Sequence, residues 1–170
     1  GANHYSSLVP KNGGAIQAGA LTTLTGVNLV LNGTGSMPTA QITTLNGNSA
    51  LTLSGSGASY DFGGLTTATT SVISLAGAAA STPNLASIDG SSFFVSGGST
   101  LALPAATSYT NTTTSNDLLR SFQATGAGSL LDLRNLTSIV NGQHYNTRLS
   151  IEALAGGEVD LRGVVQIAES

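Results

Sequence analysis

The chain has 170 residues, which is enough for one domain with a real hydrophobic core. Only 8% of the residues are charged and the formal net charge is −3 at pH 7, so the basic face that nucleic-acid binding requires is excluded. There is no Cys and no apolar run as long as a membrane span, which argues against disulfides, Cys-ligated metals and a transmembrane helix. The chain is instead rich in Gly, Ser, Thr, Asn and Ala, and 40% of its residues are hydrophobic.

A nine-residue frame recurs seven times along the chain. It reads apolar-x-apolar-x-x-apolar-Thr-Thr/Ser-apolar, and successive copies start 21, 23, 20, 21, 30 and 28 residues apart. A repeat of 20–50 residues is the signature of a solenoid or another repeat architecture. The copies are residues 16–24, 37–45, 60–68, 80–88, 101–109, 131–139 and 159–167.

A second phrase lies between the copies. It is a short stretch with apolar residues at alternate positions that runs into a cluster of Gly and Ser, as in "LVLNGTGS" at residues 29–36. Alternation predicts a strand with one buried face, and the glycines supply the positive φ of a sharp corner. The other copies begin at residues 51, 73, 93, 122 and 151.

The two phrases together predict an all-β, single-stranded parallel β-solenoid of the right-handed β-helix type. It has about seven coils of 20–23 residues, and two corner insertions, around residues 110–120 and 140–148, explain the longer spacings. Leucine-rich repeats have similar periods, but their Asn/Cys column and helical segment are missing here. We therefore rank that alternative below the solenoid.

The predicted domain organisation is one β-solenoid spanning residues 1–170. Residues 1–14 would form a cap or a linker, and the coils would run from residue 15 to residue 170. The last frame ends three residues before the end of the chain, without an obvious polar cap. Open sheet edges favour association, so we expect a fragment of a longer solenoid, and self-association through open ends is one expected partner.

The phrase Asp-x-Arg occurs twice at the same frame positions. Asp132 and Asp160 are expected to stack in adjacent coils, as are Arg134 and Arg162. Because residues i and i+2 of a strand face the same way, the four charges should gather on the outer surface. One interpretation is a recognition patch for a polysaccharide or a divalent ion; the favoured one is a structural ladder of ion pairs.

Two adjacent columns of Thr and Ser occupy the seventh and eighth frame positions. Neighbouring residues of a strand point to opposite faces, so the sequence does not predict the two outward ranks of an ice-binding surface unless the strand bends between them. A stacked ladder of hydroxyls, hydrogen-bonded from coil to coil, is the prediction. It includes Thr22, Thr43, Thr66, Thr107 and Thr137.

The second insertion, "VNGQHYNTR", carries residue types that stack on sugar rings and hydrogen-bond to them. His144 and Tyr145 are its candidate ligand-binding residues, although a solvated corner loop is the simpler interpretation. With the Asp-x-Arg residues they complete the candidate ligand-binding set: Asp132, Arg134, His144, Tyr145, Asp160 and Arg162.

Catalysis is a weaker hypothesis. Ten of the thirteen charged residues lie in the last 60, so a polysaccharide lyase or hydrolase site would have to lie there. One His near scattered carboxylates does not define such a site, and no phosphate loop, nucleophile elbow or metal-spaced His pair is present. We expect no enzyme, no catalytic residue, no cofactor and no metal.

In coil length, Gly-Ser corners and alternating phrases, residues 16–167 resemble the β-helical passenger regions of bacterial secreted adhesins. Autotransporter passengers and filamentous-haemagglutinin-like proteins are examples. The resemblance implies a secreted or cell-surface bacterial module, structural or adhesive, whose partners are polysaccharides or host and cell-surface glycans. The polysaccharide-active enzyme and the self-associating structural polymer remain as alternatives.

Overall fold

The structure is a computed structural model that describes residues 6–111 and 116–169. The first part of the predicted cap or linker and residues 112–115 of the first insertion therefore lie outside the described residues. Within the described ranges every regular element is a β-strand, and every strand pairing is parallel, as the sequence predicts for the all-β class. These ranges contain no helix long and apolar enough to cross a membrane.

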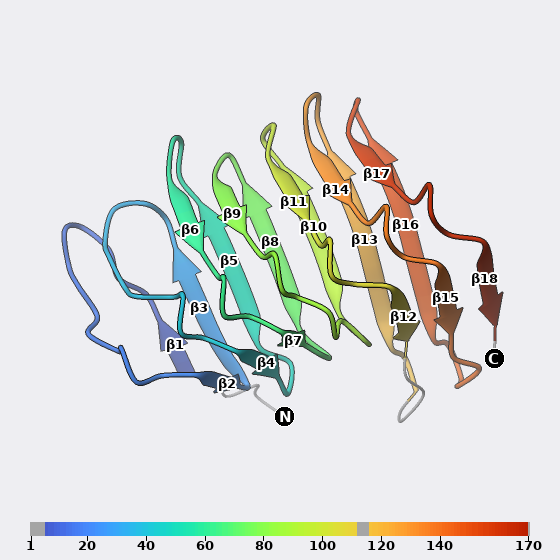
Figure 1. Ribbon diagram of the computed structural model, residues 1–170, viewed down its shortest axis with the longest axis horizontal. Helices are drawn as coiled ribbons and strands as arrows, with labels where there is room; N and C mark the ends of the chain where they lie inside the picture. The colour runs from blue at the N-terminus through green and yellow to red at the C-terminus, as the bar shows by residue number, and fades with distance from the viewer. Residues whose placement is uncertain (1–5, 112–115, 170) are drawn as a thin grey trace.

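One sheet of seven parallel strands runs the length of the molecule (Figure 1). Each repeat contributes one strand, because the alternating phrase places its apolar residues on one face. We call it the long sheet. In spatial order its strands are β1 (Ser6–Leu8), β3 (Val27–Leu31), β5 (Ala50–Ser54), β8 (Val72–Ala76), β10 (Ser92–Ser96), β13 (Leu119–Thr125) and β16 (Arg148–Leu154).

Two further rows of shorter strands accompany the long sheet. The second row begins the nine-residue frame, and it comprises β6 (Ser59–Asp61), β9 (Ala79–Ser81), β11 (Thr100–Ala102), β14 (Leu130–Asp132) and β17 (Glu158–Asp160). The third row ends the frame, and it comprises β2 (Thr23–Thr25), β4 (Thr44–Asn46), β7 (Thr67–Ala68), β12 (Ser108–Asn111), β15 (Ser138–Asn141) and β18 (Gln166–Glu169). Each row is divided into two sheets, between β9 and β11 and between β7 and β12.

The strand register confirms the alignment of the repeats. Every paired residue in the second and third rows joins equivalent positions of the frame, such as Leu101 with Leu131 and Tyr109 with Ile139. The alternating phrases pair in the same way in the long sheet, where one column reads Leu29, Leu51, Ile73, Phe93, Phe122, Ile151. The repeat seen in the sequence is thus the unit of strand pairing.

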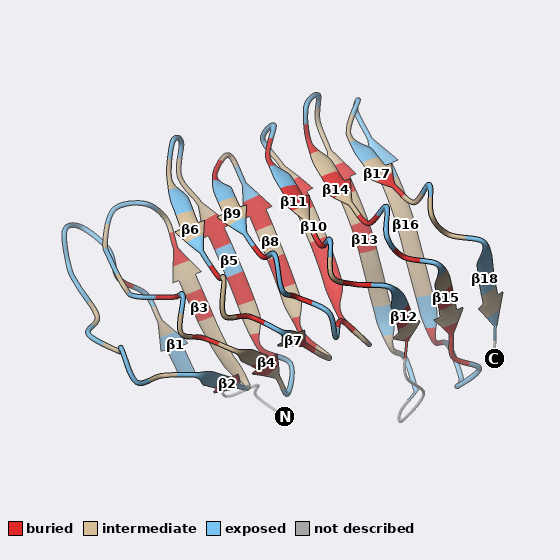
Figure 2. Cartoon of the chain, viewed as in Figure 1, coloured by how far each residue is buried: buried red, intermediate tan, exposed pale blue. Residues whose placement is uncertain are grey.

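The buried residues of the three rows, red in Figure 2, form one hydrophobic cluster. Three of its aromatic rings meet, since Phe122 packs against Phe93 with ring centroids 5.5 Å apart and against Tyr109 at 4.7 Å. All three rings are fully buried. Burial raises the pKa of Tyr109, whose hydroxyl donates to the carbonyl oxygen of Ser91 at 3.0 Å.

Buried serines stabilise the turns between rows. The Oγ of Ser49 accepts from the N–H of Val27 at 3.1 Å and donates to the carbonyl oxygen of Leu24 at 3.0 Å. Ser91 and Ser129 likewise connect one repeat to the preceding one through their hydroxyls. These hydrogen bonds satisfy backbone groups where the chain leaves a sheet, and so they explain why small polar residues are buried in this core.

The predicted threonine ladder is present, and so is the bend on which two outward ranks depend. Ile42 and Leu45 are both fully buried, so the chain bends between them, and Thr43 and Thr44 both point outward with their Oγ1 atoms 3.4 Å apart. The hydroxyls do not bond to one another along the column. Thr43 donates to the carbonyl oxygen of Thr22, Thr66 to that of Thr43, and Thr137 to that of Thr107.

The C-terminal edge of the molecule exposes apolar residues. Ile167 is 60% exposed, although the equivalent Ile139 and Tyr109 are fully buried in the two preceding repeats. Val165 is 88% exposed, and Leu154 at the end of β16 is 42% exposed. Among the described residues, β16, β17 and β18 each pair with a strand on only one side. The apolar residues of the last repeat are therefore left uncovered at this edge.

Candidate functional site

The two Asp-x-Arg phrases form the predicted cluster of ion pairs. Asp132 lies 2.7 Å from the Nη2 of Arg134, and Asp160 lies 2.8 Å from the Nη2 of Arg162. Arg134 also reaches Asp160 of the next repeat at 3.7 Å, because Asp132 and Asp160 are paired in register. The interpretation as a ladder of ion pairs is confirmed.

The detailed geometry of this cluster differs from the prediction in two respects. Each Arg follows the strand in a turn, where Asp Oδ1 accepts the backbone N–H of the Arg two residues on, at 3.2 Å for Arg134 and 3.1 Å for Arg162. Asp160 is buried, whereas an exposed outer surface was expected. The hydrogen bond from Arg162 is the main reason why the pKa of Asp160 is lowered, and Asp132 in turn raises the pKa of Arg134. The charges of this cluster are therefore compensated within it.

The two insertions occupy the same corner and stack on one another. The backbone N–H of Asp117 donates to the carbonyl oxygen of Tyr145 at 2.9 Å, and the Nδ2 of Asn146 donates to Oδ1 of Asp117 at 2.7 Å. Asp117 and Asn146 share a positive φ, at 60° and 56°. The described parts of the two loops are thus alike where they lead into β13 and β16, which pair from Leu119 and Arg148 onward.

One residue change distinguishes the repeats that carry an insertion. Where the chain turns directly from the third row into the long sheet, the turning residue has a positive φ, and it is Gly26, Gly47, Thr70 or Gly90. In the two repeats with insertions the equivalent residues are Asn111 and Asn141, which end β12 and β15. The Nδ2 of Asn111 donates to Oδ1 of Asn141 at 2.8 Å, and the Nδ2 of Asn141 donates to the carbonyl oxygen of Thr147 at 3.3 Å. This buried amide ladder fixes the base of the loops.

The predicted residues His144 and Tyr145 lie at the tip of the second loop. Nδ1 of His144 is 2.6 Å from Oδ1 of Asn116 in the first loop, and the side chain of Tyr145 is 75% exposed. Among the described residues no carboxylate forms an ion pair or a hydrogen bond with His144. His144 therefore contacts the first loop, and Tyr145 is open to solvent.

The six predicted residues do not converge on one site. The Asp-x-Arg cluster lies at the corner between the second and third rows, and the loop lies at the corner between the third row and the long sheet, with β15 between them (Figure 1). The loops instead border a groove that the sequence analysis did not identify.

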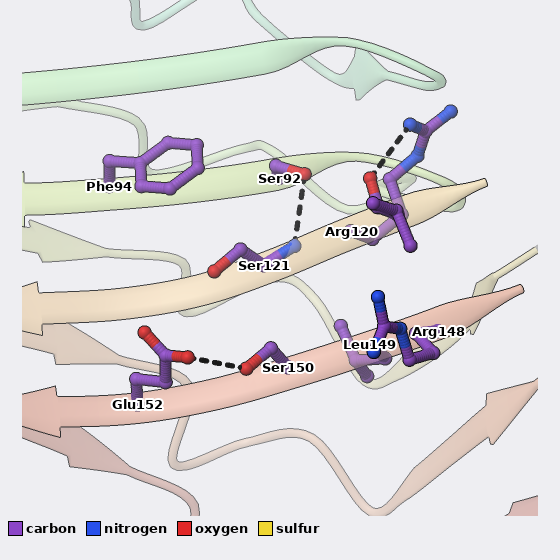
Figure 3. A pocket seen from close by; sticks show the side chains of 9 residues that line it. Ser92, Phe94, Arg120, Ser121, Arg148, Leu149, Ser150 and Glu152 are labelled. Atoms are coloured by element: carbon purple, nitrogen blue, oxygen red, sulfur yellow. Dashed lines mark hydrogen bonds between the residues drawn. The ribbon is translucent and has the colours of Figure 1, made fainter. Parts of the chain in front are cut away.

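This groove lies on the long sheet at the beginning of β13 and β16 and has a volume of about 500 Å³. Figure 3 shows Phe94, Ser121 and Glu152 on three adjacent strands, with Arg120 and Arg148 at the ends next to the insertions. The alternation of the strand aims Arg120 at the core, since Phe122 two residues on is fully buried. Arg120 itself lies at the end of the core, next to the first insertion, and its side chain lines the groove. The full lining is Ser92, Phe94, Leu119, Arg120, Ser121, Arg148, Leu149, Ser150 and Glu152.

A hydrogen-bonded carboxylate occupies one end of the groove. Glu152 accepts from the Oγ of Ser150 and from the Nε2 of Gln123, each at 2.7 Å. These bonds, that from Ser150 first, lower the pKa of Glu152 and keep it ionised.

No group of three metal-ligating side chains occurs in residues 6–111 and 116–169. Comparison with known proteins adds no family: no family model matches the chain, and no match was found to a curated protein or to a solved structure. The function must therefore be argued from the site itself.

Proposed function

We propose that the chain is a stretch of right-handed parallel β-solenoid that serves as a structural and adhesive module on the surface of a bacterium or in its secretions, and that it binds glycans. The observation that carries the proposal is the continuous register of the long sheet, in which equivalent residues of every repeat pair from β1 to β16. The single core cluster shared by the three rows supports a coiled arrangement. Right-handedness follows from the strong preference of parallel crossover connections.

The binding surface of this module is the groove together with the two stacked loops. Its residues are aromatic, hydroxyl-bearing and charged, and they surround a concave surface, which is the usual composition of a polar ligand site. Tyr145 and Phe94 offer aromatic faces to a sugar ring, and the serines and Glu152 offer hydrogen bonds to its hydroxyls. We propose that the Asp-x-Arg cluster stabilises the module instead, since each of its arginines already binds a carboxylate.

Incubation with immobilised polysaccharides tests this function and the enzymatic alternative together. The panel contains neutral and acidic polymers, and both retention of the protein and release of reducing sugars are followed. Retention without release is the expected result. Release of shorter sugars would show a lyase or hydrolase, and a protein that passes every column would contradict the adhesive role.

A self-associating polymer is the second candidate, favoured by the exposed apolar edge at Val165 and Ile167. Another solenoid end would bury these residues in the same columns that the internal repeats use. Sedimentation velocity over a wide concentration range tests it: growing species that disappear in Ile167→Lys would establish it, and a monomer at every concentration would reject it.

A further inference from the structure

We propose that the groove on the long sheet selects anionic saccharides, with the carboxylate or sulfate group of the sugar held by Arg120 and Arg148. This inference rests on the proposed glycan-binding function and names its ligand class. It concerns side chains that the repeat pattern does not explain, because both Arg residues lie at the ends of the two insertions, outside the nine-residue frame.

The four arginines of the chain differ in whether they form ion pairs. Of the four arginines, Arg134 and Arg162 each bind an aspartate, whereas Arg120 and Arg148 form no ion pair among the described residues. The two unpaired guanidinium groups line the same groove. Its one acid, Glu152, is engaged by Ser150 and Gln123. The groove therefore carries an excess positive charge on a chain whose net charge is −3.

The guanidinium group of Arg120 is only partly hydrogen-bonded. Its Nη1 donates to the carbonyl oxygen of Leu119 at 3.2 Å, while its Nε is buried and has no hydrogen-bond partner within the described part of the chain. A buried donor of a charged group is costly to leave unsatisfied. A carboxylate or sulfate group that enters the groove would accept hydrogen bonds from the guanidinium group of Arg120, because two of its oxygens match the geometry of the guanidinium fork.

Polar groups repeat along the groove. Ser121 and Ser150 are paired in register, and the N–H of Ser121 donates to the Oγ of Ser92 on the next strand (Figure 3). Phe94, Gln123 and Glu152 form a second column. Neighbouring strands lie about 4.8 Å apart, which is comparable to the length of one pyranose unit in an extended chain. A glycan that crosses the strands would thus meet hydroxyl, amide and carboxylate partners at successive sugars.

Other anionic polymers fit this groove less well. The backbones of β10 and β13 are paired on both sides, so an extended peptide could add a strand only at the free edge of β16 and not across the groove. Nucleic acids are bound through many cations along a phosphate backbone, whereas this groove has two, with Glu152 nearby. A saccharide with spaced anionic groups and free hydroxyls fits both the charges and the acceptors.

Isothermal titration calorimetry with matched ligands tests the proposal on the full chain. The probes are oligogalacturonate, its methyl ester, chondroitin sulfate oligosaccharide and its desulfated form. The acidic member of at least one pair is expected to bind at least ten times more tightly than its neutral partner. Arg148→Gln should weaken that binding about tenfold or more, as expected for the loss of a charge-assisted hydrogen bond. Lys11→Gln is the matched control, because it removes the same charge from an exposed residue outside the groove lining.

Each outcome separates this inference from the function on which it rests. Equal affinity for acidic and neutral probes, unchanged in Arg148→Gln, would overturn the anionic selectivity and leave glycan adhesion standing. Equal losses in Arg148→Gln and Lys11→Gln would show a diffuse charge effect and would also overturn it. If no probe binds and the polysaccharide columns do not retain the protein, the proposed function fails as well. Circular dichroism of both variants verifies that the fold is retained.

Discussion

Replacement of Phe122 by Ala tests whether the three rows of strands share one core. Phe122 is fully buried and contacts the rings of Phe93 and Tyr109 at 5.5 and 4.7 Å between centroids. A buried Phe→Ala substitution costs about 3–5 kcal/mol of unfolding free energy, and the lost aromatic contacts place this site toward the upper end. A loss of that size is a large part of the stability of a typical domain.

The assay is equilibrium unfolding in urea followed by far-UV circular dichroism, with the midpoint and slope compared between variants. Phe94→Ala is the matched control. It makes the same change on β10, where Phe94 follows the buried Phe93 and lies on the opposite face of the strand. We expect it to cost about 1 kcal/mol, because a partly exposed side chain loses less buried area. Equal losses in the Phe94 and Phe122 variants, or a loss below about 1.5 kcal/mol in the latter, would refute the assignment of faces.

Two further predictions concern the corners. Gly64→Ala should destabilise the protein by about 1–3 kcal/mol, because a Cβ there would lie 2.2 Å from the carbonyl oxygen of Ala40. Gly19→Ala is the control: a Cβ at Gly19 has no atom within 4 Å, so this variant should change the urea midpoint little. Asp160 has a lowered pKa in the folded protein, so its contribution to stability is present above its ordinary value of 3.8 and is lost as the pH falls through the folded pKa. The stability difference between the parent chain and Asp160→Asn should therefore be constant near neutral pH and shrink below about pH 4; a difference that grows on acidification would contradict the ion-pair assignment.

The strand pairing could be predicted from the sequence because it depends on a local and repeated property. Side chains alternate along a strand, so an apolar column such as Leu101, Leu131 fixes which residues lie opposite each other. The ion pairs of the Asp-x-Arg cluster followed from the same register. The outward direction of both threonine columns depends on a bend between Ile42 and Leu45 that breaks the alternation, and the frame gives no separate signal for that bend.

The groove was missed because its residues are far apart in the sequence. Phe94, Arg120 and Arg148 lie on three different strands, and only the register of the long sheet makes them neighbours. One signal was available. Arg120 occupies a position that alternation assigns to the core, and a charged residue at such a position is costly unless the site gives it a partner.

The asparagines that replace glycines at the loop corner have a consequence for how such a chain can vary. Because Asn111 and Asn141 hold the loop bases while β13 and β16 keep their register, the length and content of a loop are independent of the strand pairing beneath it. A Gly in a left-handed turn closes the corner, as at Gly90, and an extended Asn opens it. The residue type at one position per repeat thus differs between plain corners, where it has a positive φ, and corners that carry an insertion, where it is an Asn at the end of a strand.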